Sequence, residues 1–128
     1  MRCGLIGRRL GHSYSCQIHH ALADYSYELW ELEPEELETF FRRQDFTGVN
    51  VTIPYKQAVI PLLDEIDTAA RDLHSVNTDR FADGKATGFN TDILGFAESL
   101  NRDGVSLQGK KVLLLGYGGA ASVMAYHC

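Results

Sequence analysis

This 128-residue sequence is poor in several residue types, and each shortage excludes a class of protein. Its three cysteines, Cys3, Cys16 and Cys128, are too few and too scattered for a disulfide framework or a zinc site. Their odd number fits a reducing compartment, so we expect a cytoplasmic protein. No apolar stretch approaches the roughly 18 residues of a membrane-spanning helix. The N-terminus shows no secretory signal, and we expect no membrane association.

Positive charge is also scarce. Twelve Lys and Arg stand against 17 Asp and Glu, which gives a formal net charge of −5. An acidic chain without a basic run is unsuited to the phosphate backbone of nucleic acid. His12, His19 and His20 lie close in sequence, but adjacent residues of a helix point about 100° apart. His19 and His20 therefore do not converge on one ion, and we expect no metal site.

Hydrophobic residues make up 45% of the chain, and their spacing alternates between the patterns of strands and helices. The length suffices for one domain with a core but not for a two-domain enzyme. We expect strands over residues 1–6, 27–32, 48–53, 76–81, 85–89 and 111–115. We expect helices over residues 15–25, 55–63, 64–73 and 91–102, another beginning at Pro34, and a last one from Ala120. This order predicts an α/β fold with a mostly parallel sheet flanked by helices.

Three local signals refine this prediction. Asp64 is the expected N-cap of the helix over 64–73. Asp83-Gly84 is typical of a hairpin turn between two strands. Leu37, Phe40 and Phe41 give the helix that begins at Pro34 one apolar face.

A glycine loop follows the last apolar strand. The sequence runs from Val112-Leu113-Leu114-Leu115 into Gly116-Tyr117-Gly118-Gly119-Ala120. In such a loop the first glycine makes a tight turn, and the second lets backbone amides approach a pyrophosphate at the helix N-terminus. We therefore expect Gly116, Gly118, Gly119 and Ala120 to bind a dinucleotide. Only nine residues follow Gly119, whereas a βαβ unit needs about 30, so we expect the truncated start of a Rossmann domain.

Polar residues gather in four further segments, where strands are expected to end. They are Gly11 to Ser15, Asn50 to Lys56, Val76 to Thr78, and Gly88 to Asp92. Singly, each has a structural explanation, such as a helix cap or a turn residue. Together they supply hydroxyls, amides, one amine and one carboxylate. These groups suit the binding of a small polyhydroxylated acid and the transfer of one proton.

The segments resemble, in order and spacing, the motifs of the shikimate dehydrogenase family. Ser13-Tyr14-Ser15 matches the family's Ser-x-Ser, and residues 50–56 match Asn-Val-Thr-(Ile/Val)-Pro-(Tyr/Phe)-Lys without a gap. Residues 76–78 match Val-Asn-Thr, residues 90–92 match Asn-Thr-Asp, and residues 116–120 match Gly-x-Gly-Gly-Ala. The resemblance covers essentially the whole chain.

The resemblance implies two parts, a shikimate-binding catalytic domain over residues 1–103 and the incomplete start of an NAD(P)-binding Rossmann domain over 104–128. It implies reversible reduction of 3-dehydroshikimate to shikimate with NADP, in the biosynthesis of chorismate and aromatic amino acids. It also implies that the protein is a monomer or a homodimer with a small-molecule substrate. Because most of the cofactor site would be missing, we expect the 128-residue chain to be inactive alone.

The same resemblance implies the role of each site residue. Ser13, Ser15 and Thr52 would bind the carboxylate side of the substrate. Asn77 and Asp92 would bind its ring hydroxyls. Lys56 would bind the substrate as the catalytic amine, with Asp92 as its partner in the catalytic pair.

The sequence departs from the family pattern at three places. Cys16 stands where the family commonly has proline after the serine pair. His74-Ser75 replaces Gly-Ala before Val-Asn-Thr, and a histidine there is strained if the backbone has a positive φ. Tyr117 replaces alanine inside the glycine loop, where its side chain must point away from a pyrophosphate.

Two alternatives remain open at this stage. The first is a quinate/shikimate dehydrogenase paralogue that uses NAD. The second is a non-catalytic module that binds a small molecule, which requires the chain to be natural at this length.

Overall fold

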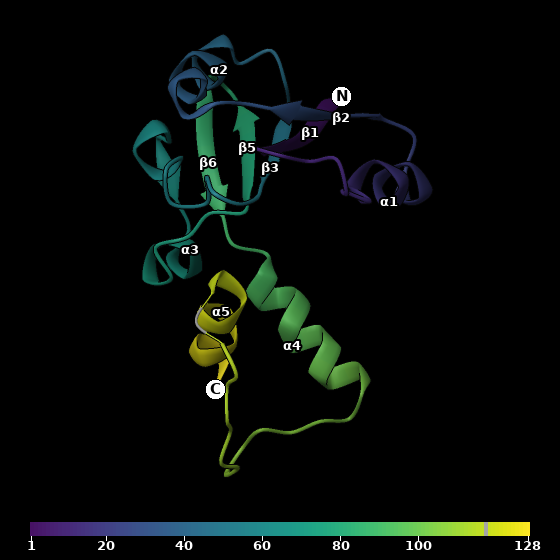
Figure 1. The fold of residues 1–128 in the computed structure, drawn as a ribbon, viewed down its shortest axis with the longest axis vertical. Helices are drawn as coiled ribbons and strands as arrows, with labels where there is room; N and C mark the ends of the chain where they lie inside the picture. The colour runs from purple at the N-terminus through teal and green to yellow at the C-terminus, as the bar shows by residue number, and fades with distance from the viewer. Residues whose placement is uncertain (117) are drawn as a thin grey trace.

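In a computed structural model, which describes residues 1–116 and 118–128, the strands form one six-stranded sheet in the order β2-β1-β3-β5-β6-β4 (Figure 1). The strands are β1 (Arg2–Gly7), β2 (Ser26–Glu31), β3 (Gly48–Val51), β4 (Glu65–Ile66), β5 (Thr78–Ala82) and β6 (Lys85–Phe89). β1 is parallel to β2 and β3, β4 is parallel to β6, and β5 is antiparallel to both its neighbours. Since β5 alone among these strands is reversed, the prediction of a mostly parallel sheet is confirmed.

Some helices flank this sheet and others lead away from it. The helices are α1 (Ser15–Leu22), α2 (Leu37–Arg43), α3 (Thr68–Asp72), α4 (Asp92–Arg102) and α5 (Gly119–His127), with single 3-10 turns η1 (Pro34–Glu36) and η2 (Ile60–Leu62). α1 contacts the edge strand β2, whereas α4 leads away from the sheet and packs against α5 (Figure 1). None of the helices in the described part of the chain is long and apolar enough to cross a membrane.

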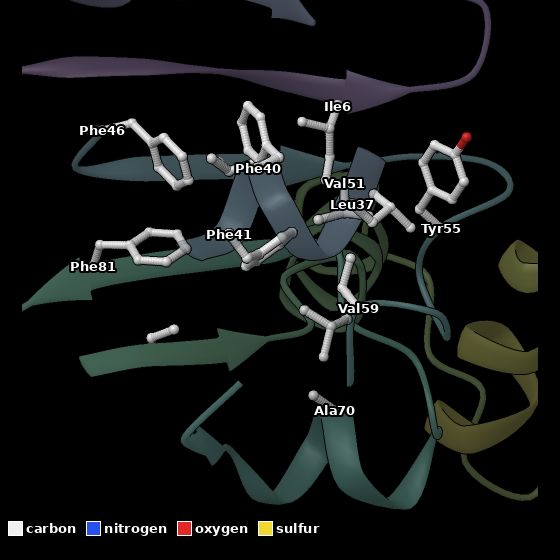
Figure 2. Close-up of a cluster of buried hydrophobic side chains, with 13 residues drawn as sticks. Ile6, Leu37, Phe40, Phe41, Phe46, Val51, Tyr55, Val59, Ala70 and Phe81 are labelled. Atoms are coloured by element: carbon white, nitrogen blue, oxygen red, sulfur yellow. The ribbon is translucent and has the colours of Figure 1, made fainter. Parts of the chain in front are cut away.

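The main core lies between the sheet and α2. Leu37, Phe40 and Phe41 are all buried, as their spacing predicts. Figure 2 shows α2 against the strands, with Phe46 and Phe81 beside it. The Phe46 ring stacks on Phe40 with centroids 4.6 Å apart and meets Phe81 edge-on at 4.5 Å. This packing fixes β3 and β5 firmly, and the polar segments extend from the ends of these strands.

The hairpin prediction is confirmed, because β5 and β6 pair across Asp83-Gly84. The prediction of one helix over residues 64–73 is wrong. Asp64 caps no helix, since its Oδ2 accepts from the backbone N–H of Ala86 in β6 at 2.7 Å. Asp67 takes the capping role instead and accepts from Ala70 N at 2.7 Å. The two aspartates are spaced so that a short parallel strand, β4, fits between them.

Other predicted boundaries also shift. Residues 55–63 form turns and the 3-10 turn η2, not an α-helix, around Pro61. The expected helix over 15–25 ends at Leu22, and the strand over 48–53 ends at Val51.

The apolar segment 111–115 does not form a strand, contrary to the prediction. Leu113 and Leu115 are 82% and 90% exposed. A strand exists only where its backbone groups pair with a neighbour, and no described strand lies beside this segment. The helix expected after the glycine loop does form, as α5, while Tyr117 lies outside the described residues.

His74, which stands where the family pattern has glycine, ends α3 in a backbone conformation that favours glycine. α3 ends in a Schellman motif, in which Ser75 N donates to Ala70 O and His74 N donates to Arg71 O, both at 3.0 Å. His74 therefore adopts a left-handed conformation, with φ +48°. We expect His74→Gly to raise the free energy of unfolding by about 1 kcal/mol, measured by urea denaturation. Ala69→Gly, inside the same helix, is the control and should lower the free energy by a similar amount. A destabilising His74→Gly would contradict this interpretation.

Candidate active site

A cavity of about 560 Å³ lies at the edge of the sheet where β1, β3 and β6 end. These three strands run the same way, so their carboxyl ends meet there, and the reversed strand β5 begins there. The residues just before β5 and just after β6 therefore reach the same place. The size suits a small-molecule ligand. The lining comprises Leu5, Arg9, Leu10, Gly11, His12, Ser13, Ser15, His19, Asn50, Val51, Thr52, Lys56, Asn77, Thr91 and Asp92.

All the predicted substrate-binding and catalytic residues line this one cavity. They are Ser13, Ser15, Thr52, Lys56, Asn77 and Asp92. They come from four segments separated by up to about 80 residues of sequence, and the sheet topology brings them together. Their roles toward a ligand stay predictions.

Lys56 and Asp92 form an ion pair on the wall of the cavity. Lys56 Nζ lies 2.7 Å from Asp92 Oδ2, and the two side chains are 26% and 42% exposed. The loop after β3 positions Lys56, and its backbone carbonyl accepts from Val76 N at 2.8 Å. Asp92 is the first residue of α4, where the helix dipole favours a carboxylate. The pair is accessible to a ligand. It combines a proton donor, the amine of Lys56, with a carboxylate that orients this amine.

The serine pair lies at the start of α1, of which Ser15 is the first residue. Ser13 Oγ donates to Ser15 Oγ at 3.0 Å and accepts from Ser15 N at 3.2 Å. Within this pair Ser15 Oγ only accepts, so its own proton can go to the phenol of Tyr27 or to a ligand. Cys16, which replaces the usual proline, packs beside Leu5, Leu10 and Tyr27.

A cation lines the cavity near the serines. Arg9 forms no ion pair among the described residues, whereas its neighbour Arg8 pairs with Glu33. The cavity thus holds two cations, Arg9 and Lys56, against the single carboxylate of Asp92. This excess of positive charge suits an anionic ligand.

Asn50 and Thr91 also line the cavity, although their motifs alone did not single them out. Asn50 is an amide between Val49 and Val51 in strand β3, and this break in an apolar pattern was the available signal. Its Oδ1 accepts from Tyr27 OH at 2.7 Å, and its Nδ2 donates to Thr78 Oγ1 at 3.1 Å. A polar network therefore continues beneath the wall of the cavity.

A stacked histidine and burial hold the phenol of Tyr27 in this network. The imidazole of His19 stacks on its ring, with centroids 3.7 Å apart and planes 11° from parallel. Burial raises the pKa of the Tyr27 phenol well above its usual range, so the phenol remains a hydroxyl that can donate. Burial, with a contribution from nearby His20, lowers the pKa of His19, which favours its neutral form.

The predicted cofactor residues, Gly116, Gly118, Gly119 and Ala120, do not line the cavity. Gly116 has φ +134°, and a Cβ at Gly116, Gly118 or Gly119 would meet no atom within 4 Å. Their backbone is therefore open to a large ligand, and α5 begins at Gly119. The described residues fit a pyrophosphate at this helix N-terminus. No group of three or more His, Cys, Asp or Glu within the described part of the chain could hold a metal ion.

Several known proteins are similar to this chain. It is 39% identical to the shikimate dehydrogenase (NADP(+)) of Aquifex aeolicus, over 96% of this chain and 49% of that protein. The enzyme of the same name from Carboxydothermus hydrogenoformans is 42% identical, with 96% and 47% covered. The chain thus spans about half the length of the curated relatives it matches.

Solved structures show the same relationship. Shikimate 5-dehydrogenase from Thermus thermophilus, crystallised in complex with shikimate, is 36% identical with a TM-score of 0.90. The superposition covers 99% of this chain and 51% of that one. Residues 5–78 match the family described as the shikimate dehydrogenase substrate binding domain. From its sequence and its fold, the chain belongs to the shikimate dehydrogenase family.

Proposed function

We propose that this chain is the substrate-binding part of an NADP-dependent shikimate dehydrogenase, which interconverts 3-dehydroshikimate and shikimate. The observation that carries the proposal is the convergence of Ser13, Ser15, Thr52, Asn77 and the Lys56–Asp92 pair on one cavity. The Thermus thermophilus relative, which binds shikimate, supports the choice of substrate. In this proposal, residues 1–103 form the substrate domain and residues 104–128 begin the cofactor domain.

Shikimate is a cyclohexene carboxylate with three ring hydroxyls, and the cavity is lined by groups that complement both. Ser13, Ser15 and Thr52 would bind the carboxylate through their hydroxyls. The side chains of Asn77, Asp92 and Lys56 would bind ring hydroxyls. Both donors and acceptors are needed because each ring hydroxyl has one proton and two lone pairs.

The Lys56–Asp92 pair supplies the proton of the reaction. The cofactor, when bound, supplies or accepts the hydride. In the direction of reduction, the Lys56 ammonium donates a proton to the oxygen of the keto group as that oxygen becomes a hydroxyl. Asp92 Oδ2 lies 2.7 Å from Lys56 Nζ and orients the amine for the transfer. In the reverse direction, the neutral amine accepts the hydroxyl proton.

The glycine loop is the proposed site of the cofactor pyrophosphate. Gly116, Gly118, Gly119 and Ala120 would present backbone amides at the start of α5, in the open space above the glycines. NADP is the favoured dinucleotide because the curated relatives are named for it.

Calorimetric titration of the 128-residue chain with shikimate tests the substrate proposal. We expect saturable binding to one site, and Ser15→Ala should weaken it about tenfold by removing a hydrogen bond to a charged group. Ser99→Ala, at an exposed position of α4, is the matched control and should bind as the original chain does. Absence of binding would contradict the proposal that shikimate is the substrate. Tighter binding of quinate than of shikimate would assign quinate as the substrate instead.

A further inference from the structure

A chain of hydrogen bonds runs from Tyr27 beneath the cavity to α4. Tyr27 OH donates to Asn50 Oδ1 at 2.7 Å, and Asn50 Nδ2 donates to Thr78 Oγ1 at 3.1 Å. Thr78 Oγ1 in turn donates to Asn77 Oδ1 at 3.1 Å. Asn77 Oδ1 also accepts from the backbone N–H and the hydroxyl of Thr91, at 2.9 and 3.2 Å. Four side chains from β2, β3 and β5 and the adjoining loop are thus linked to the start of α4.

One backbone group fixes the direction of this whole chain. The N–H of Thr91 can only donate, so the oxygen of the Asn77 amide must face it. That oxygen also takes the hydroxyl proton of Thr78, so Thr78 Oγ1 accepts from Asn50, and it lies 3.4 Å from the hydroxyl of Thr91 as well. Asn50 must therefore turn its Nδ2 toward Thr78 and its Oδ1 toward Tyr27. A flipped Asn77 would place its amide nitrogen against the N–H of Thr91. A flipped Asn50 would take the proton of Thr78 away from Asn77 and leave two oxygens 3.1 Å apart without a proton between them.

The fixed direction decides what the cavity presents to a ligand. With Oδ1 of Asn77 turned inward, its Nδ2 has no partner among the described residues and is left to donate. The second proton of Asn50 Nδ2 is likewise unused within the network. Asn50 and Asn77 both line the cavity, whereas Tyr27 and Thr78 do not. The wall between them offers N–H donors and no amide oxygen.

We propose that Thr78 and Tyr27 are positioning residues, which orient the amides of Asn50 and Asn77 so that both donate to the ring hydroxyl oxygens of a ligand. The proposal rests on the proposed function, since shikimate carries such ring hydroxyls. Thr78 has the larger role, because it links the two amides and passes the direction set by Thr91 to Asn50. Tyr27 completes the chain at its far end.

Replacement of Thr78 by valine tests this role, because valine keeps the shape and removes only the hydrogen-bonding hydroxyl. We expect Thr78→Val to raise the Kd of shikimate about tenfold, measured by calorimetry on the 128-residue chain. Thr78→Ser restores the hydroxyl and should bind within about twofold of the original chain. Tyr27→Phe should raise the Kd by a smaller factor, about threefold, since Asn50 keeps its bond to Thr78.

A ligand without ring hydroxyls distinguishes positioning from general damage. 1-Cyclohexene-1-carboxylate keeps the carboxylate of shikimate, and its weak binding is measurable by NMR titration. We expect Thr78→Val to leave its Kd unchanged, whereas a structural effect would weaken both ligands equally. Equal loss for both, or unchanged shikimate binding in Thr78→Val, would overturn the proposal while leaving the proposed function intact. Failure of the original chain to bind shikimate would overturn both. If Thr78→Val does not fold, the same comparison is made with Tyr27→Phe.

Discussion

Asp79→Val is expected to raise the free energy of unfolding at pH 7 by roughly 3 to 5 kcal/mol. Asp79 lies in β5 on the same face as Phe81 and is only 1% exposed. Neither of its carboxylate oxygens has a hydrogen-bond partner among the described residues. A buried, unpaired carboxylate is costly, and burial raises its pKa from 3.8 to about 8. Valine fills a similar volume and removes this cost.

The raised pKa also gives the effect a definite pH dependence. The folded chain holds the Asp79 proton up to about pH 8, while the unfolded chain releases it near pH 3.8. Between these values the folded state binds more protons, so the contribution of Asp79 to stability falls as the pH rises. This stabilising contribution is fully present below about pH 3.8, the pKa of Asp79 in the unfolded chain. It is lost as the pH rises through about 8, the pKa in the folded chain. Asp79→Val should abolish this slope.

Urea denaturation of both chains at several pH values between 4 and 9 measures the difference directly. Asp79→Asn is the matched control, because it removes the titration but keeps a buried polar group. Its stability should lose the same pH slope and gain less at pH 7 than that of the valine variant. A difference between Asp79→Val and the original chain that stays constant across this pH range would contradict the account.

Lys56→Met is expected to lower kcat for shikimate oxidation by roughly 10²- to 10⁴-fold, the usual loss of a general acid–base group. The measurement requires a fusion of this chain to the remaining half of a relative such as the Aquifex aeolicus enzyme. The effect follows from the position of Lys56 Nζ, on the cavity wall and 2.7 Å from Asp92. Methionine keeps much of the length of the side chain but has no proton to transfer.

Lys56→Arg separates proton transfer from charge. Arginine keeps a cation beside Asp92, but a guanidinium does not give up its proton in proteins. The arginine variant should therefore bind shikimate nearly as the original chain does and still lose turnover. Turnover close to that of the unchanged fusion, in either variant, would show that Lys56 is not the proton donor.

Local signals in the sequence predicted the fold well where the pairing is also local. The hairpin at Asp83-Gly84 and the apolar face of α2 depend on neighbouring residues, and both are confirmed. The strand at 111–115 failed because pairing depends on a partner, and apolar character alone supplies none. The helix at 64–73 failed because Asp64 and Asp67 are equally good caps in sequence, and only the contact with β6 distinguishes them.

The candidate site was predicted through its motifs, and the missed residues lie within them. Asn50 and Thr91 belong to matched segments, yet their geometry depends on β5 running against its neighbours. This reversal places Asn77 beside Thr91 and Thr78 beside Asn50. Asp79 was missed because a single aspartate in a strand pattern looks like a solvent-facing residue until its face of the sheet is known.

The central claim is that the cavity at the sheet edge binds shikimate. Its most direct test is an NMR titration of the ¹⁵N-labelled chain with shikimate, following the backbone amides. We expect the resonances of Ser15, Thr52, Asn77 and Asp92 to shift together with one Kd, while those of the distant turn at Asp83-Gly84 stay in place. Unchanged spectra, or shifts confined to residues away from the cavity, would contradict the claim.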